Sequence, residues 1–309
     1  MLLRIYTHIF ANLRLYFQII TIFAEYLIQN IVKQHLFQFL RMKKILICTS
    51  VTLLVLLSVC AIIAVKSIVH VQLPHGAMLH VLPAFNNNKV YGAVVICPGG
   101  GYCYLKKWHE GYLWFPYFFK RGYTVAMLEY KMPKGDYRIP MTDAAEAIRV
   151  MRCRADEWHF NKDNVGIMGF SAGGHLASTM LVTDNDSVRP NFGILFYPVI
   201  SMKKELTHMD SHDQLLGKDA SIQLEYQFSN ELHVSEKTPP TFIAVTSDDK
   251  AAIPQNSIRF HDAMRAKKRP VSLFIYPSGG HGWVCQFTSE YRKSALDELT
   301  NWLNDRLYE

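Results

Sequence analysis

The chain has 309 residues, of which 50% are hydrophobic and 19% are charged, a balance typical of a folded protein rather than a disordered one. Its formal net charge is +7, but seven basic residues and one acidic residue lie at or before Lys66, so the remainder is close to neutral. A near-neutral domain has no electrostatic footprint for DNA or RNA, and we predict no nucleic-acid partner. The six cysteines match no zinc-binding spacing, and we predict neither a metal nor a cofactor.

The amino-terminal region is predicted to be a targeting segment that precedes one folded domain, 67–309. Residues 45–65 are apolar and uncharged, long enough to span a bilayer, and follow a basic stretch. We expect residues 42–66 to be a secretory signal, either cleaved or retained as an anchor, which makes the domain periplasmic or secreted. Membrane contact is expected through this segment only. Residues 1–41 are interpreted as a mis-called upstream extension of a chain whose translation starts at Met42, with an extra apolar leader that forms an amphipathic or membrane helix as the alternative.

The domain alternates apolar runs with helical patterns. Continuous apolar runs indicate strands that are buried on both faces, and strands that alternate with helices indicate a mainly parallel, doubly wound α/β sheet. The predicted strands are Met78–Leu82, Val90–Cys97, Thr124–Leu128, Val165–Phe170, Phe192–Tyr197, Thr241–Val245 and Val271–Tyr276. Helices are expected from Thr142 or Asp143 onward, over Pro254–Lys267 and over Tyr291–Arg306. The polar segment 201–240 is interpreted as a small cap-like insertion.

The six residues Gly169–Gly174, with the sequence G-F-S-A-G-G, connect a predicted strand to a predicted helix. They place Ser171 at the centre of G-x-S-x-G, the pattern of a nucleophile elbow, in which a sharp turn exposes a serine hydroxyl at the top of a sheet. The alternative is a glycine-rich loop with an incidental serine. A nucleophilic serine also needs a base and donors for an oxyanion, so the rest of the chain decides between the two interpretations.

An acid and a base follow Ser171 in the order that this scaffold requires. The strand at 241–245 leads into Asp248 and Asp249, and we choose Asp249 because it lies further into the turn, with Asp248 as the runner-up. His281 lies among glycines after the last predicted strand and is the expected base. The competing histidines are His75, His109, His175 and His261.

The loop Pro98–Tyr102 contains three glycines directly after an early strand, where an oxyanion hole is expected. We predict that the amides of Gly100, Gly101 and Ala172 are its donors. The alternatives are a flexible turn and a phosphate-binding loop, and a nucleotide site is disfavoured because no G-K-[ST] follows. Cys97 and Cys103 flank this loop and either pair in an oxidising compartment or, as we favour, remain free. Two aromatic residues, Tyr102 and Trp283, are candidate substrate contacts, with packing beneath the loops as the alternative.

Several motifs together resemble the acetylxylan-esterase-like branch of the α/β-hydrolases, which includes the ferulic-acid-esterase-like proteins of Bacteroidetes. The motifs are Cys97–Tyr102, His109–Gly111, Gly169–Ala177, Tyr197–Ile200, Pro239–Phe242, Asp249, Gln255–Ser257 and Gly280–Gly282. The resemblance runs from about Pro74 to the carboxyl terminus. It implies an α/β-hydrolase fold and a serine esterase with Ser171 as nucleophile, Asp249 as acid and His281 as base.

The resemblance further implies removal of acyl groups, often acetyl, from plant-polysaccharide sugars, with an acylated carbohydrate or a small ester as substrate. Two other functions remain open at this point. A peptidase of the prolyl-oligopeptidase kind shares the fold and the order of the triad, although this chain is too short for an added propeller domain. A membrane-tethered binding protein without activity is disfavoured by the intact candidate triad.

Overall fold

The computed structural model describes residues 67–84 and 91–306, together with a few isolated helical positions between 29 and 50. The chain divides into two compact units, Met1–Lys66 and Ser67–Glu309. The expected leader and its apolar stretch lie almost wholly outside the described residues, so the targeting segment and the start at Met42 stay predictions. A search of the described residues found no helix that is both long and apolar enough to cross a membrane.

The second unit is built on one eight-stranded sheet with the order β1-β2-β4-β3-β5-β6-β7-β8. Strands β1 and β2 run antiparallel to their neighbours, and the pairs from β4 through β8 are parallel. The strands are β1 Val69–Gln72, β2 Met78–Leu82, β3 Ala93–Cys97, β4 Thr124–Glu129, β5 Val165–Phe170, β6 Phe192–Phe196, β7 Thr241–Thr246 and β8 Val271–Tyr276. The predicted mainly parallel α/β sheet is confirmed.

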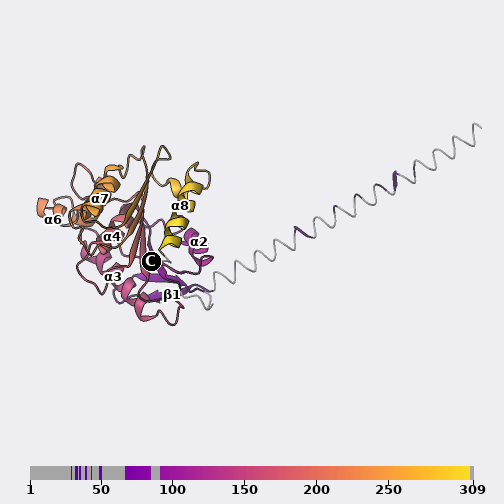
Figure 1. Cartoon of the computed structure of the whole chain (residues 1–309), viewed down its shortest axis with the longest axis horizontal. Helices are drawn as coiled ribbons and strands as arrows, with labels where there is room; N and C mark the ends of the chain where they lie inside the picture. Colours follow the sequence, from indigo (N-terminus) through magenta and orange to yellow (C-terminus); the bar gives the residue numbers. More distant parts are fainter. Residues whose placement is uncertain are drawn as a thin grey trace, which may run out of the picture. The chain divides into compact units, whose positions relative to one another are not determined.

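Helices cover both faces of this sheet. Figure 1 shows α3, α4 and α7 on one side of the strands and α2 and α8 on the other. The described helices are α2 Phe115–Phe119, α3 Arg138–Cys153, α4 Ser171–Leu181, α5 Met209–Leu216, α6 Ile222–Gln227, α7 Gln255–Ala266 and α8 Arg292–Asp305, with short 3-10 turns at Tyr112–Trp114, Asn230–Leu232 and Trp283–Cys285. The sheet is therefore doubly wound, as the sequence predicts.

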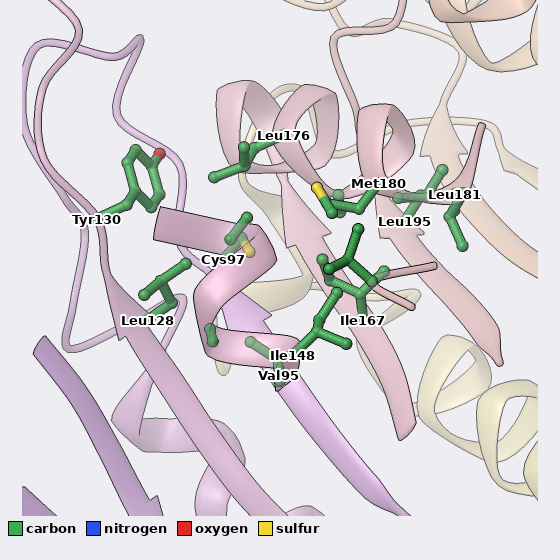
Figure 2. Packing of buried hydrophobic residues seen from close by; sticks show 14 of the residues in the cluster. Val95, Cys97, Leu128, Tyr130, Ile148, Ile167, Leu176, Met180, Leu181 and Leu195 are labelled. Atoms are coloured by element: carbon green, nitrogen blue, oxygen red, sulfur yellow. The ribbon is translucent and has the colours of Figure 1, made fainter. Parts of the chain in front are cut away.

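The central strands are apolar along their whole length because each of their two faces packs against a different core. On β3, Val95 belongs to the core under α3 and α4, whereas Val94 and Ile96 belong to the core under α2 and α8. Figure 2 shows the first core, where Val95 of β3 and Ile167 of β5 lie below the side chains of α4. Strand side chains point alternately to opposite faces, so two cores leave no polar face on β3.

Local chemistry explains where the structure departs from the predicted boundaries. Helix α3 begins at Arg138, a full turn before the predicted start at Thr142 or Asp143. The Asp136 carboxylate accepts the Arg138 N–H at 3.0 Å, and Pro140 lies in the first turn, where an N–H has no intrahelical partner in any case. Asp143 is instead buried within the helix and accepts the Lys131 N–H at 2.9 Å.

One edge strand and one strand boundary also differ from the prediction. Strand β1 was not predicted, because it is only four residues long and alternates half-buried with exposed positions. Strand β3 begins at Ala93 rather than at Val90. The segment 201–240 carries α5 and α6 between β6 and β7. The parallel strands β3, β5, β7 and β8 have their carboxyl ends on the same side of the sheet. The residues of the predicted site lie in the loops that follow these strands or, for Ser171 and Ala172, in the first turn of α4.

Candidate active site

Ser171 is the first residue of α4 and directly follows β5. Its φ of 52° lies in the left-handed region, which is strained for a residue with a Cβ and is the conformation that a nucleophile elbow imposes. The elbow also needs glycine nearby. A Cβ at Gly169 would lie 2.2 Å from the Gly173 carbonyl oxygen, and one at Gly173 would lie 2.1 Å from the Cys97 carbonyl oxygen. Helix α4 can therefore start against the end of β3 only if these positions lack side chains.

The structure brings Ser171, His281 and Asp249 into one chain of hydrogen bonds. The His281 Nε2 atom lies 2.8 Å from the Ser171 Oγ, and the His281 Nδ1 atom lies 2.8 Å from an Asp249 carboxylate oxygen. An ionised carboxylate only accepts hydrogen bonds, so Nδ1 carries the proton and Nε2 is left to accept the serine O–H. This is the arrangement in which an imidazole can take a proton from a serine as it attacks.

The two adjacent aspartates hold different parts of this arrangement. The Asp249 side chain is fully buried, and its second oxygen accepts the N–H groups of Ala251 and Ala252 at 2.9 and 3.0 Å. The exposed Asp248 accepts the N–H groups of Gly280 and Gly279 at 2.8 and 3.2 Å, and these bonds lower the pKa of its carboxyl. Asp249 therefore meets His281 directly, whereas Asp248 shapes the loop that carries His281.

The competing histidines lie elsewhere. His175 is a buried residue of α4, where its Nε2 donates to the Phe228 carbonyl at 2.8 Å and its Nδ1 accepts the Tyr102 hydroxyl at 3.0 Å. Burial lowers the pKa of His175 to about 4, so it is neutral and fully paired. His75 and His109 are exposed, and His261 pairs with the neighbouring Asp262 at 3.0 Å.

The predicted oxyanion loop lies beside Ser171. A Cβ at Gly99 would lie 2.9 Å from the Ser171 Cβ, which places this loop against the elbow. Gly100 and Gly101 have φ values of 133° and 63°, conformations that L side chains rarely adopt. Ala172 lies in the first turn of α4, where N–H groups have no intrahelical partner and the helix dipole is positive. Gly99 thus brings this loop to the serine, and Ala172 directly follows it, whereas the roles of Gly100, Gly101 and Ala172 as donors stay predictions.

Two predicted substrate contacts are wrong. The side chains of Tyr102 and Trp283 are fully buried, so neither offers a surface to a sugar ring. Tyr102 packs inside the core with His175, and Trp283 packs against Tyr276 with ring centroids 4.9 Å apart. Packing beneath the loops, the alternative for these residues, is what the structure shows. Tyr104, two residues beyond Tyr102, has 58% of its surface exposed and faces solvent.

The described cysteines are free. Cys97 is buried at the end of β3, which raises the pKa of its thiol, whereas Cys103 is exposed. The free thiol that we favoured over a disulfide is therefore the state in the structure. Within residues 67–84 and 91–306, no group of three or more His, Cys, Asp or Glu side chains is arranged to hold a metal ion.

A buried carboxyl to which the sequence analysis gave no role, Glu110 of the motif His109–Gly111, links two parts of the site. Glu110 is 1% exposed, and its two oxygens accept the Gly99 N–H at 2.7 Å and the Tyr197 hydroxyl at 3.1 Å. The Tyr197 ring in turn lies edge-on to the His281 ring, with centroids 4.9 Å apart. Glu110 therefore links the oxyanion loop to the base. The sequence indicates Glu110 through the motif His109–Gly111, but the polar stretch around it gives no sign that the side chain is buried.

A second imidazole that sequence analysis also missed lies next to the oxyanion loop. A Cβ at Gly101 would lie 3.9 Å from the His208 Cε1 atom. His208 belongs to the segment 201–240, which the sequence connects to the site only as a cap-like insertion. Nothing in its local sequence predicts this approach, because it is a contact between segments that are far apart in the chain.

A strained serine at an elbow, a histidine and a buried aspartate at the carboxyl edge of a doubly wound sheet define an α/β-hydrolase. A model of the BD-FAE family matches residues 80–264. This is more than half of the chain, and the chain therefore belongs to the BD-FAE family. The resemblance inferred from the sequence motifs is confirmed.

Known proteins of similar sequence and structure agree with this assignment. An acetylxylan esterase from Xylanibacter ruminicola is 41% identical over 216 residues, covering 68% of this chain and 45% of that protein. Endo-1,4-beta-xylanase B from Butyrivibrio fibrisolvens is 34% identical over 212 residues, covering 64% of this chain and 33% of that protein. This chain thus spans less than half the length of these two curated relatives.

Among solved structures, an acetyl ester-xyloside bifunctional hydrolase from Caldicellulosiruptor lactoaceticus has a TM-score of 0.66 and 31% identity. The match covers 74% of this chain and 88% of that chain. Unlike the two relatives above, this protein is thus matched over most of its length. The α/β-hydrolase fold predicted from the sequence is confirmed by this similarity.

Replacing Glu110 by glutamine tests the buried carboxyl through the pH dependence of stability. Burial raises the pKa of Glu110 above its ordinary value of 4.5, partly offset by Lys106, the Gly99 N–H and Tyr197. The folded protein therefore prefers the protonated, neutral form of Glu110, and protonation of Glu110 stabilises the fold. This stabilisation is fully present below pH 4.5 and is lost as the pH rises through the raised pKa. We expect thermal melts to show Glu110→Gln gaining stability relative to wild type as the pH rises from about 4.5.

The same substitution at the exposed Glu290 controls for the general effect of removing one charge. A difference in midpoint between wild type and Glu110→Gln that stays constant from acid to neutral pH contradicts the raised pKa. The readout needs no substrate and is therefore independent of any assigned activity.

Proposed function

We propose that this chain is a serine esterase that removes acyl groups, chiefly acetyl, from plant-polysaccharide sugars through an acyl-enzyme. The observation that carries the proposal is the continuous hydrogen bonding from Ser171 through His281 to the buried Asp249. The substrate class is supported by the relatives, which are named acetylxylan esterase, endo-1,4-beta-xylanase and acetyl ester-xyloside bifunctional hydrolase.

In the proposed acylation step, His281 Nε2 takes the proton of Ser171 as the hydroxyl oxygen attacks the ester carbonyl. Asp249 keeps the imidazole oriented through Nδ1 and stabilises its positive charge. The carbonyl oxygen becomes an oxyanion and is received by the amides of Gly100, Gly101 and Ala172. When the tetrahedral intermediate collapses, His281 returns the proton to the leaving alcohol oxygen and the acyl group stays on Ser171.

The second half of the cycle uses the same groups with water. His281 takes a proton from a water molecule, whose oxygen attacks the acyl carbonyl, and then gives that proton to the Ser171 oxygen as the ester bond breaks. The products are a carboxylic acid and the regenerated enzyme. No step requires a metal or a cofactor, because the imidazole and the amides perform the proton transfer and the charge stabilisation.

Removing the nucleophile is the direct test. We expect Ser171→Ala to fold with an unchanged circular dichroism spectrum and to hydrolyse p-nitrophenyl acetate and acetylated xylan near the background rate, a loss of about 10⁶-fold in kcat. Turnover equal to wild type removes Ser171 from the mechanism. Wild-type protein that fails to react with a fluorophosphonate probe supports an inactive binding protein, and cleavage of a proline dipeptide amide in place of esters supports a peptidase.

The two adjacent aspartates provide a matched pair. Asp249→Asn leaves the shape of the side chain but loses the charge that fixes the His281 tautomer, so we expect kcat to fall by about 10⁴-fold. Asp248→Asn weakens the bonds to the loop of Gly279 and Gly280 and is expected to lower kcat far less, because the side chain does not touch His281. Measuring kcat for both variants on p-nitrophenyl acetate checks this, and the reverse order contradicts the assignment of Asp249 as the acid.

We also propose that the chain is exported, through the segment 42–66. The support is its basic start followed by the uncharged apolar stretch 45–65. We expect a carboxyl-terminally tagged full-length chain to be found in the envelope or medium fraction of a Gram-negative host, and a variant without 45–65 to be found in the cytoplasm. Wild-type chain confined to the cytoplasm contradicts export.

A further inference from the structure

His208 caps helix α5 (Met209–Leu216), and this fixes the chemistry of its ring. Its Nδ1 atom accepts the backbone N–H of Ser211 at 3.4 Å and lies 3.0 Å from the Ser211 hydroxyl oxygen. A backbone N–H can only donate, so Nδ1 must be the unprotonated nitrogen of the ring. The proton of the neutral imidazole therefore lies on Nε2, which makes Nε2–H a donor.

This donor is not used within the protein. Across residues 67–84 and 91–306, the Nε2 atom of His208 has no hydrogen-bond partner, although the side chain is half-buried. Burial, the largest influence, lowers the pKa of His208. The charge of Asp210 raises it, His281 lowers it and Asp249 raises it. The ring is thus neutral at pH 7, and two members of the triad, His281 and Asp249, both influence its pKa.

The donor lies beside the oxyanion loop. The Cε1 atom, which is bonded to Nε2, lies 3.9 Å from the position of a Cβ at Gly101. Two residues beyond this loop, the Tyr104 ring lies 3.3 Å from the position of a Cβ at Gly100, and 58% of this residue is exposed. The loop expected to hold the reacting carbonyl is therefore bordered by an unpaired N–H donor and by an exposed aromatic ring.

We propose that the Nε2–H of His208 donates a hydrogen bond to an oxygen of the sugar that carries the ester, and so selects carbohydrate esters over simple ones. The inference rests on the proposed esterase function and deepens it. A pyranose offers hydroxyl and ring oxygens next to the ester and an apolar face for Tyr104. A simple aryl acetate has no such oxygen, so its binding displaces water from the donor without giving the donor a new partner, which disfavours that substrate.

Replacing His208 by asparagine isolates this donor. Asparagine is among the best N-cap residues, so α5 keeps its cap, but the shorter side chain no longer extends to the Gly101 loop. We expect the ratio of kcat/KM for acetylated xylotriose to kcat/KM for p-nitrophenyl acetate to fall by about 10-fold or more in the full-length variant. Where His208→Asn fails to fold, His208→Ser keeps a capping side chain and gives the same test.

His233→Asn is the matched control. His233 is exposed on the same segment, and its Nε2 atom lies 2.9 Å from the Tyr226 carbonyl oxygen rather than beside the oxyanion loop. We expect this variant to keep the wild-type ratio. A ratio that falls equally in both variants shows that the effect belongs to the segment as a whole, and overturns the assignment to His208.

Two further outcomes overturn the inference without touching the proposed function. One is an unchanged ratio in His208→Asn. The other is an equal fall in kcat/KM for both esters, which assigns His208 to the oxyanion or to the fold rather than to the sugar. Failure of the proposed function gives a different result, because wild-type protein then hydrolyses neither ester above background.

Discussion

The close approach of helix α4 to the end of strand β3 is the contact on which the site depends. Gly173 lies so near the Cys97 carbonyl that any side chain there would clash, and this approach holds Ser171 in its left-handed conformation. Such strain costs about 1–3 kcal/mol. Burying one leucine-sized side chain contributes about 1.5–3 kcal/mol, so the packing of Leu176 and Ile167 in the core beneath α4 is enough to maintain it.

The parallel sheet then determines which groups can meet the serine. In the order β3-β5-β6-β7-β8, the strands are parallel, so the segments that follow β3, β5, β7 and β8 all leave the sheet on the same side. These segments contain the oxyanion loop, Ser171, Asp249 and His281. Beneath them, Glu110 holds the Gly99 N–H and the Tyr197 hydroxyl. One buried carboxyl thereby couples the loop that would receive the oxyanion to the residue that packs against the base.

In two places in this site, neighbouring residues of the same type have different surroundings. Asp248 and Asp249 differ by one position, yet one turns towards the glycines of the next loop and the other towards His281. Tyr102 and Tyr104 flank one cysteine, yet the first is fully buried and the second mostly exposed. The side chains of neighbouring residues in a turn point in different directions. The residue type therefore indicates which chemical group is present, and the geometry of the turn determines what that group contacts.

The amino-acid sequence by itself determined the mainly parallel fold and the order of serine, aspartate and histidine, because continuous apolar runs and glycine turns are local signals. It did not determine burial in loops. Tyr102 and Trp283 have the side chains of sugar contacts but belong to the core, and α3 starts at Arg138 because Asp136 accepts its N–H. Glu110 and His208 reach the site through contacts between segments far apart in the chain. Only the tertiary structure decided these, because such contacts leave no periodic pattern in the sequence.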